Sequence, residues 1–133
     1  MRHWWGSKMT IGPHEGRELA LMLAGQKKLA AFGDVIPENN VIHEVIIPEQ
    51  AFEPYVKTGK IIRLEKHIKA DDGNMIRYVC FTLPDEEWRA EAYFWIREKN
   101  HHNVFPADQS VDTMIGRLLG YDEADIADFN SQF

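Results

Sequence analysis

Hydrophobic and polar residues alternate most regularly in the middle of the chain, over residues 60–69 and 75–83. A period of two predicts two β-strands that each bury one face. The segment Asp71-Asp72-Gly73-Asn74 separates them, and an Asp-Gly pair favours a two-residue hairpin loop because that turn needs positive φ angles. With Asp72-Gly73 as the loop, the register pairs Ile62 with Leu83, Leu64 with Phe81, Lys66 with Val79 and Ile68 with Arg77.

A third run, residues 88–97, also alternates between apolar and polar or larger aromatic positions. It admits a helix as well, because Pro84-Asp85-Glu86-Glu87 resembles a helix start. Alternation sustained over the whole run favours a strand. With residues 84–87 as a hairpin loop, the buried faces of all three strands align, and a slip of one residue would destroy that agreement.

Apolar spacing and capping residues predict the flanking elements. A proline inside a helix costs about 3 kcal/mol, so Pro54 should break the helix around it or limit it to one turn. The expected elements are helices from Pro13 to Gly25, from Glu49 to Lys57, from Asp108 or Ser110 to Leu119 and from Asp122 onward, with strands at 28–32 and 41–47. Together they predict an α+β fold, with an antiparallel β-meander sheet and helices packed on one face in two layers.

Composition places the chain among ordinary folded domains. Its 133 residues are 44% hydrophobic and 27% charged, which suits one domain over residues 1–133, with residues 1–12 as a lead-in segment. A single cysteine, Cys80, excludes an internal disulfide and fits a reducing compartment. Neither a signal peptide nor a run of about 18 apolar residues is visible, so we expect a cytoplasmic protein without a membrane partner.

Negative charge is concentrated towards the end of the chain. The net charge is −6, and residues 107–133 hold six acids against one base. A nucleic-acid-binding protein would show a basic stripe, and none is evident, so we expect no nucleic-acid partner. The acidic segment is read as a solvated surface, or else as a docking region for a basic protein.

The expected register places a polar and aromatic patch on the sheet face opposite the core. Stacking aromatic rings and arginine forks can bind a ligand carboxylate or phosphate, and exposed aromatics also mark protein contacts. A plain solvated face with cross-strand ion pairs is the alternative. The candidate ligand-binding or interface residues are Arg63, Glu65, His67, Tyr78, Arg89, Glu91, Tyr93 and Trp95.

Other chemistry-bearing residues do not form a recognisable motif. Cys80 is expected to be a buried structural cysteine, because flanking glutamates would raise the pKa of its thiol. His101-His102 lacks the spacing of metal ligands, and the chain holds neither a phosphate-binding glycine loop nor a nucleophile elbow. We therefore expect no metal and no cofactor.

Three stretches carry a resemblance to known proteins: residues 16–25, residues 81–92 with Glu86-Glu87-Trp88-Arg89, and residues 117–121. They resemble small uncharacterised bacterial proteins of the accessory genome, of the kind carried by mobile gene cassettes. The resemblance covers about a third of the chain and brings no functional motif. It implies a bacterial cytosolic protein.

Three functions are compatible with these patterns. The first is a non-enzymatic protein-interaction module, a homodimer that uses the aromatic sheet face or Trp4-Trp5. The second is a small-molecule-binding protein that uses the polar and aromatic sheet face. The third is a small enzyme with His67 or Glu91 as its base.

Overall fold

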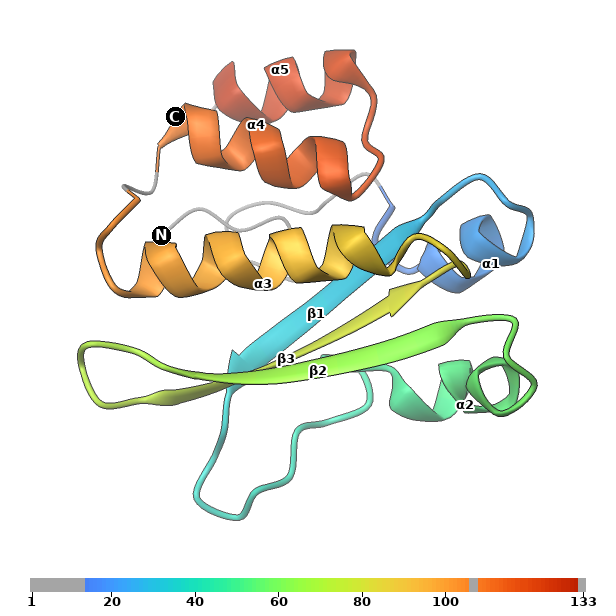
Figure 1. Ribbon diagram of the computed structural model, residues 1–133, viewed down its shortest axis with the longest axis horizontal. Coiled ribbons are helices and arrows are strands. Elements are labelled where there is room, and N and C mark those ends of the chain that lie inside the picture. The colour runs from blue at the N-terminus through green and yellow to red at the C-terminus, as the bar shows by residue number, and fades with distance from the viewer. Residues whose placement is uncertain (1–13, 106–107, 132–133) are drawn as a thin grey trace.

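The computed structural model describes residues 14–105 and 108–131, which form an α+β fold around a three-stranded antiparallel sheet (Figure 1). The predicted fold class is therefore confirmed. The expected lead-in, with Trp4 and Trp5, lies outside the described residues. In chain order the elements are α1 (Glu18–Leu23), β1 (Leu29–Val35), α2 (Glu49–Lys57), β2 (Ile62–Lys69), β3 (Met75–Thr82), α3 (Glu87–His101), α4 (Gln109–Leu118) and α5 (Glu123–Ser131).

The β2–β3 hairpin forms as predicted, but its register differs by one residue. Ile62 pairs with Thr82 and Leu64 with Cys80. The cause is the loop, which has three residues rather than two: the Ala70 N–H donates to the Asn74 carbonyl at 2.8 Å, and Gly73 adopts a φ of 90°. A three-residue loop with a left-handed glycine is the next common hairpin type. Because side chains alternate between the two faces of a strand, this shift places every side chain of β3 on the opposite face of the sheet from the one predicted relative to β2.

The prediction of a third meander strand at residues 88–97 is wrong, because this segment belongs to helix α3. Its buried residues include Ala90, Tyr93, Phe94 and Arg97, which follow helical spacing and form one stripe. The third strand of the sheet is β1, so the strand order is β1-β3-β2 instead of a meander. The alternative interpretation, in which Pro84-Asp85-Glu86-Glu87 begins a helix, is the correct one.

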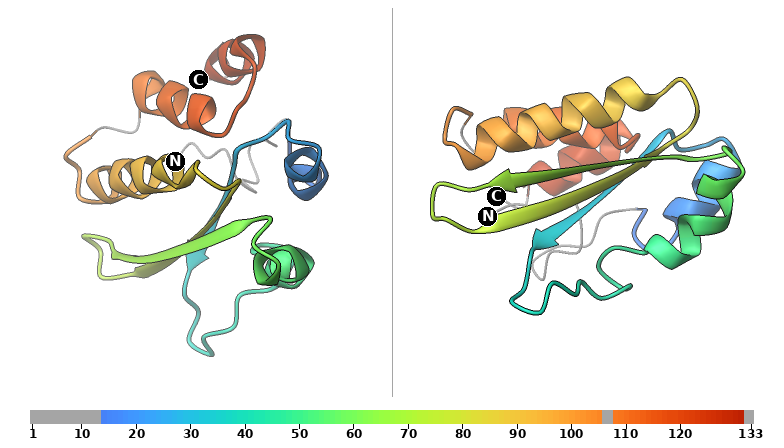
Figure 2. Two further views of the ribbon diagram at one scale, coloured as in Figure 1. Left: turned by 45° about the vertical axis from the view of Figure 1, so that its right-hand side comes forward. Right: turned by 60° about the horizontal axis from the view of Figure 1, so that its bottom comes forward.

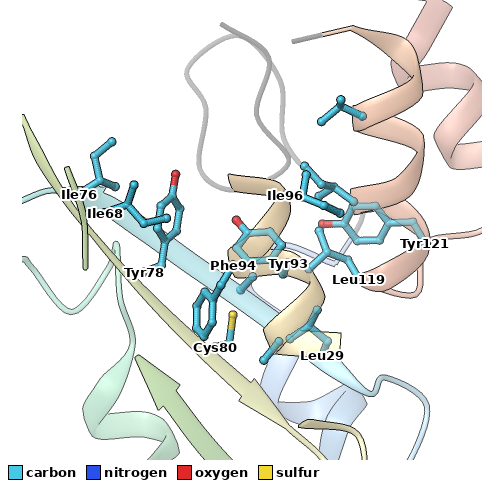
Figure 3. Close-up of a cluster of buried hydrophobic side chains, with 14 of the residues drawn as sticks. Leu29, Ile68, Ile76, Tyr78, Cys80, Tyr93, Phe94, Ile96, Leu119 and Tyr121 are labelled. Atoms are coloured by element: carbon cyan, nitrogen blue, oxygen red, sulfur yellow. The ribbon is translucent and has the colours of Figure 1, made fainter. Parts of the chain in front are cut away.

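Helices cover both faces of the sheet, which corrects the expected two-layer arrangement with helices on one face (Figure 2). Tyr78 and Cys80 of β3 point into a core formed with α3, α4 and α5 (Figure 3). Val79 and Phe81, which alternate with them, pack in a second core with α1 and α2. Strands buried on both faces need not show the alternation of a one-sided sheet.

The remaining elements follow the sequence only in part. Asp108 caps α4, because its carboxylate accepts from the backbone N–H groups of Ser110 and Val111. The strand expected at 41–47 does not form, and that segment is a turn-rich connection to α2. Helix α2 runs through Pro54 without a break, contrary to expectation. Pro54 has no N–H to donate to the carbonyl of Gln50, four residues earlier in the helix. Gln50 is exposed, so water can supply the missing hydrogen bond.

Candidate functional site

The eight predicted site residues do not form a single patch. Arg63, Glu65 and His67 lie together on β2, on the face that also carries α2. Arg89, Glu91 and Trp95 belong to α3, on the other side of the sheet. Tyr78 and Tyr93, expected to be exposed, are fully buried in the core between the sheet and α3. Two errors cause this outcome, the one-residue slip of the hairpin and the helix at 88–97.

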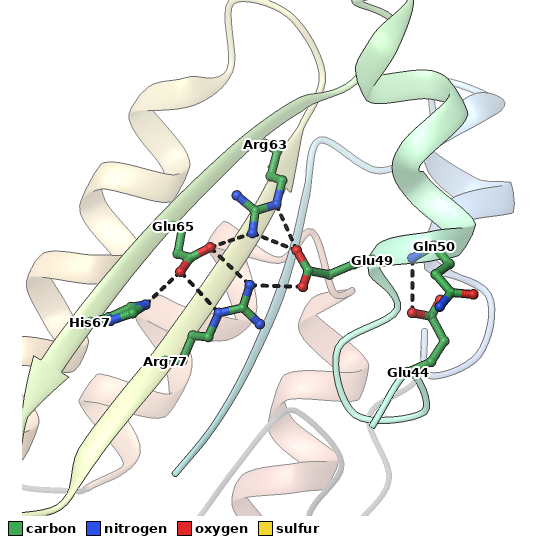
Figure 4. Close-up of polar contacts among 7 residues, drawn as sticks. All are labelled: Glu44, Glu49, Gln50, Arg63, Glu65, His67 and Arg77. Carbon is green, nitrogen blue, oxygen red and sulfur yellow. Dashed lines mark hydrogen bonds and ion pairs between the residues drawn. The ribbon is translucent and has the colours of Figure 1, made fainter. Parts of the chain in front are cut away.

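The β2 residues form a closed network of charges with two residues that the sequence analysis did not select (Figure 4). Arg63 contacts Glu49 at 2.6 Å and also pairs with Glu65. Arg77 bridges the same two carboxylates, at 2.9 Å to Glu49 and 3.1 Å to Glu65. His67 contacts the other oxygen of Glu65 at 2.6 Å. Two guanidinium groups and two carboxylates therefore alternate around a ring.

Elements far apart in the sequence position this network. The observed hairpin register sets His67 opposite Arg77, so β2 and β3 contribute neighbouring charges. Glu49 is the first residue of α2, and the Glu44 carboxylate accepts from the next two backbone N–H groups of that helix, those of Gln50 and Ala51. A carboxylate at a helix start is favourable because the helix dipole is positive there. The network thus fastens the first turn of α2 to the sheet.

The network holds its carboxylates in the ionised form. Hydrogen bonds from Arg77, and then from Arg63 and His67, lower the pKa of Glu65 to about 2 against the opposing effect of burial. For Glu49, burial raises the pKa, but the hydrogen bonds from Arg77 and Arg63 outweigh it and the net shift is downward. Each guanidinium already faces two carboxylates, so an anionic ligand would have to displace one of them. The arrangement favours a structural role.

Replacing Glu65 with Gln is expected to destabilise the protein in a pH-dependent way. The native pKa of about 2 lies below the ordinary 4.5, so the unfolded chain takes up the proton first as the pH falls. The wild type should have a free energy of unfolding about 1 kcal/mol larger than that of Glu65→Gln, the size expected for a partly exposed network. This difference should be complete above pH 4.5 and should shrink towards pH 2. Urea unfolding at several pH values measures it.

Glu53→Gln is the matched control for that measurement, because Glu53 is an exposed carboxylate of α2 and its ion pair with Lys57 is 3.9 Å long. Its difference from the wild type should be small at every pH. A Glu65→Gln penalty that stays constant down to pH 2 would contradict the assigned role of the network.

The predicted residues Tyr78 and Tyr93 belong to a buried polar cluster instead of a binding face. The Tyr78 hydroxyl lies 2.5 Å from Nε2 of His101, and Arg97 Nε donates to the Tyr93 hydroxyl at 3.1 Å. Burial raises the pKa of Tyr78 to about 12. Cys80 lies beside them, fully buried, and burial raises the pKa of its thiol. The prediction of a buried cysteine is confirmed, and a thiol held protonated is a poor nucleophile.

Lys27 is a buried charged residue that the sequence analysis did not select. Lys27 is 2% exposed, and its ammonium group donates to the Leu119 carbonyl and lies 2.9 Å from Nδ1 of His14. Leu119 is the C-terminal cap of α4, where the helix dipole is negative. Burial lowers the pKa of Lys27 to about 7, although the nearby Glu18 acts in the opposite direction. The contacts tie the loop after α1 to the end of α4.

The outward face of α3 carries the largest exposed side chains among the described residues. Trp88 is 55% exposed and Trp95 is 54% exposed. They are seven residues apart, about two helical turns, so they lie on the same face. The Arg89 guanidinium lies over the Trp88 ring at 4.7 Å, and the Trp95 ring meets Phe105 edge-on at 5.1 Å. Trp95 is the predicted site residue whose exposed aromatic character persists in the structure.

Comparison with protein families, curated proteins and solved structures finds no match for this chain. Within the described residues, no three His, Cys, Asp or Glu side chains come close enough to hold a metal ion. Over those same residues, the structure also contains no helix with the length and apolar character to span a membrane. What the protein does is therefore inferred from its own geometry.

Proposed function

We propose that the protein is a non-enzymatic interaction module that forms a homodimer through the outward face of α3. The supporting observation is the pair of half-exposed tryptophans, Trp88 and Trp95, on one face of a regular helix. Tryptophan is enriched at protein interfaces and among the residues that dominate binding energy. A rigid helix that presents two of them costs little conformational entropy on association.

The alternatives of ligand binding and enzyme activity find less support in the geometry. The residues predicted to line a ligand site do not lie together. Some are in the buried core, some belong to the charge network, whose members pair with one another, and some are on α3. His67, one candidate base, already contacts Glu65. Glu91, the other, is exposed on α3. An efficient base needs a substrate positioned within hydrogen-bond reach of it.

A basic partner protein is the second candidate. Residues 107–133, which include α4 and α5, carry six acids and one base, and α4 packs beside α3. An acidic segment that packs beside the helix with the exposed tryptophans is suited to a basic partner surface with apolar pockets. A bacterial origin in a mobile cassette and a cytoplasmic location remain predictions from the sequence.

Light scattering tests the homodimer directly. The wild type should have twice the chain mass of 15.4 kDa, and Trp88→Ala/Trp95→Ala should have the mass of one chain, because each lost anchor removes about 2 kcal/mol or more of binding free energy. Val45→Ala is the control, since Val45 is 84% exposed but lies outside α3. It should stay dimeric.

Circular dichroism and thermal unfolding should show that the double variant remains folded, because both side chains are mostly exposed. A double variant that keeps the dimeric mass would place the interface elsewhere. A wild type that is monomeric at about 0.1 mM would refute the homodimer and leave the basic partner as the surviving candidate.

A further inference from the structure

The outward face of α3 has a pattern that is complementary to itself. Counting from Trp95, the positions four residues away on either side are Glu91 and Lys99, one acidic and one basic. The positions seven residues away are Trp88 and His102, both exposed, and His102 is the C-terminal cap of the helix. Offsets of four and seven residues keep side chains on one helical face, so these five residues form a single stripe.

A two-fold axis through Trp95 would bring unlike members of the stripe together. When two copies of a helix pack antiparallel about such an axis, a residue four positions after the centre faces the residue four positions before it in the other copy. Both lie about 6 Å along the helix from the axis, given a rise of about 1.5 Å per residue. Glu91 of each copy then faces Lys99 of the other. Trp88 faces His102, and the two Trp95 rings meet at the centre.

Two of the charges on α3 that lack ion pairs are joined by this arrangement. Within each copy, Glu98 pairs with Lys66 at 3.7 Å and Arg89 pairs with Glu86 at 2.8 Å. By contrast, neither Glu91 nor Lys99 forms an ion pair with any residue in the described part of the chain. An intermolecular pair across a two-fold axis forms twice, so its contribution is doubled.

Other arrangements of two α3 helices bring like charges together. A parallel pair in register would set Glu91 against Glu91 and Lys99 against Lys99. An antiparallel pair centred midway between Trp88 and Trp95 would place the two Glu91 carboxylates side by side and leave Lys99 without a partner. Like charges in direct opposition destabilise an interface and discriminate against wrong pairings. Charge complementarity therefore selects Trp95 as the centre.

We infer that a second copy of this chain docks antiparallel on α3, with Trp95 on the two-fold axis and Glu91 paired with Lys99 of the other copy. The inference rests on the proposed homodimer and adds its orientation and register. The partner of each copy is thus defined by its chemistry, an exposed tryptophan flanked by a lysine and a glutamate one turn away on either side.

Charge reversal at these two positions tests the register. Glu91→Lys and Lys99→Glu each create two repulsive contacts per dimer and should weaken the dimer about tenfold or more, which corresponds to about 1.4 kcal/mol. The double variant Glu91→Lys/Lys99→Glu restores opposite charges and should recover the wild-type dissociation constant. Sedimentation at several protein concentrations measures all four dissociation constants. Glu53→Lys, an exposed reversal on α2, should leave the dimer unchanged.

A mixture of the two single variants adds a sharper test. In a mixed dimer every contact between these positions joins opposite charges, so Glu91→Lys and Lys99→Glu should associate with each other more tightly than either does with itself. High salt should reduce all of these differences.

The outcomes separate this inference from the proposed function. A wild-type dimer that Trp88→Ala/Trp95→Ala dissociates, but that the single reversals leave unchanged, would overturn the register and keep the homodimer. A parallel arrangement would give the same insensitivity, because the single reversals only exchange one like pair for another. A monomeric wild type would overturn both.

Discussion

Replacing Tyr93 with Ala is expected to lower the free energy of unfolding by about 3–5 kcal/mol, the range for a large aromatic side chain removed from a core. Tyr93 is 0% exposed, although it lies only two residues from the exposed Trp95. Its ring meets Tyr78 edge-on at 5.9 Å and Phe94 at 6.4 Å. Truncation would leave a cavity at the centre of the core between the sheet and α3, because close-packed neighbours relax only partly.

A second contribution comes from the buried arginine next to Tyr93. Arg97 lies one turn further along α3, is itself buried, and donates from Nε to the Tyr93 hydroxyl at 3.1 Å. Its guanidinium also lies 5.1 Å from the centre of the Tyr93 ring. Removing an acceptor from a buried charged donor costs about 1–3 kcal/mol. The penalty of Tyr93→Ala is therefore expected towards the upper end of its range.

Two controls separate these contributions in urea unfolding experiments. Tyr93→Phe keeps the ring and removes the hydroxyl, so it should lose about 1–3 kcal/mol. Trp95→Ala changes a larger aromatic on the same helix, but at an exposed position. Measured at protein concentrations low enough to keep every variant monomeric, it should lose about 1 kcal/mol or less. If Tyr93→Ala cost no more than Trp95→Ala, Tyr93 would be at the surface, as the strand interpretation of residues 88–97 requires.

The sequence predicted the elements better than their pairing. Caps and turns carry local signals, so the starts of α4 and α5 and the β2–β3 hairpin were found. The hairpin register depends on loop length, and Asp72-Gly73 suits both a two-residue loop and the three-residue loop that forms. That single ambiguity moved Tyr78 from the expected polar face into the core.

The segment 88–97 shows why a local pattern can satisfy two periods at once. Trp88 and Trp95 are seven residues apart, which suits one helical face, while the smaller apolar residues between them alternate as in a strand. What decided between the two was tertiary: Ala90, Tyr93 and Phe94 bury against the sheet as a helical stripe. The sequence of this segment alone does not show that the sheet is available to bury a helical stripe.

The candidate site was incomplete because its members come from distant elements. Glu49 of α2 and Arg77 of β3 complete the network around Glu65, and their separations in sequence leave no local signature. The same holds for Lys27, whose main partner, Leu119, is 92 residues away. By contrast, the proposed dimer stripe lies within one helix. Once the helix is known, Glu91, Trp95 and Lys99 can be read from the sequence directly.

Gly33→Ala is the second substitution with a large expected effect, a loss of about 2–3 kcal/mol from overpacking. Gly33 of β1 pairs with Tyr78 of β3. A Cβ atom at position 33 would lie 2.4 Å from Cδ1 and 2.6 Å from Cε1 of the Tyr78 ring. The ring cannot move aside easily, because Tyr78 is fully buried and its hydroxyl contacts His101. Thermal and urea unfolding measure the loss.

Asp34→Ala, at the next and exposed position of β1, is the matched control and should change the stability by about 0.5 kcal/mol or less. A double-mutant cycle with Tyr78→Ala identifies the cause, because the methyl group has no ring to meet once Tyr78 is truncated. Gly33→Ala should then add almost nothing to the loss from Tyr78→Ala. A penalty that persists without the ring would mean that Gly33 is required by its backbone instead. Since Gly33 faces Tyr78 only in the observed register, the coupling also tests how β1 is paired in the sheet. A glycine covered by a cross-strand aromatic ring is a recognised way to fix strand register, and it explains how an edge strand with few large side chains keeps its place beside β3.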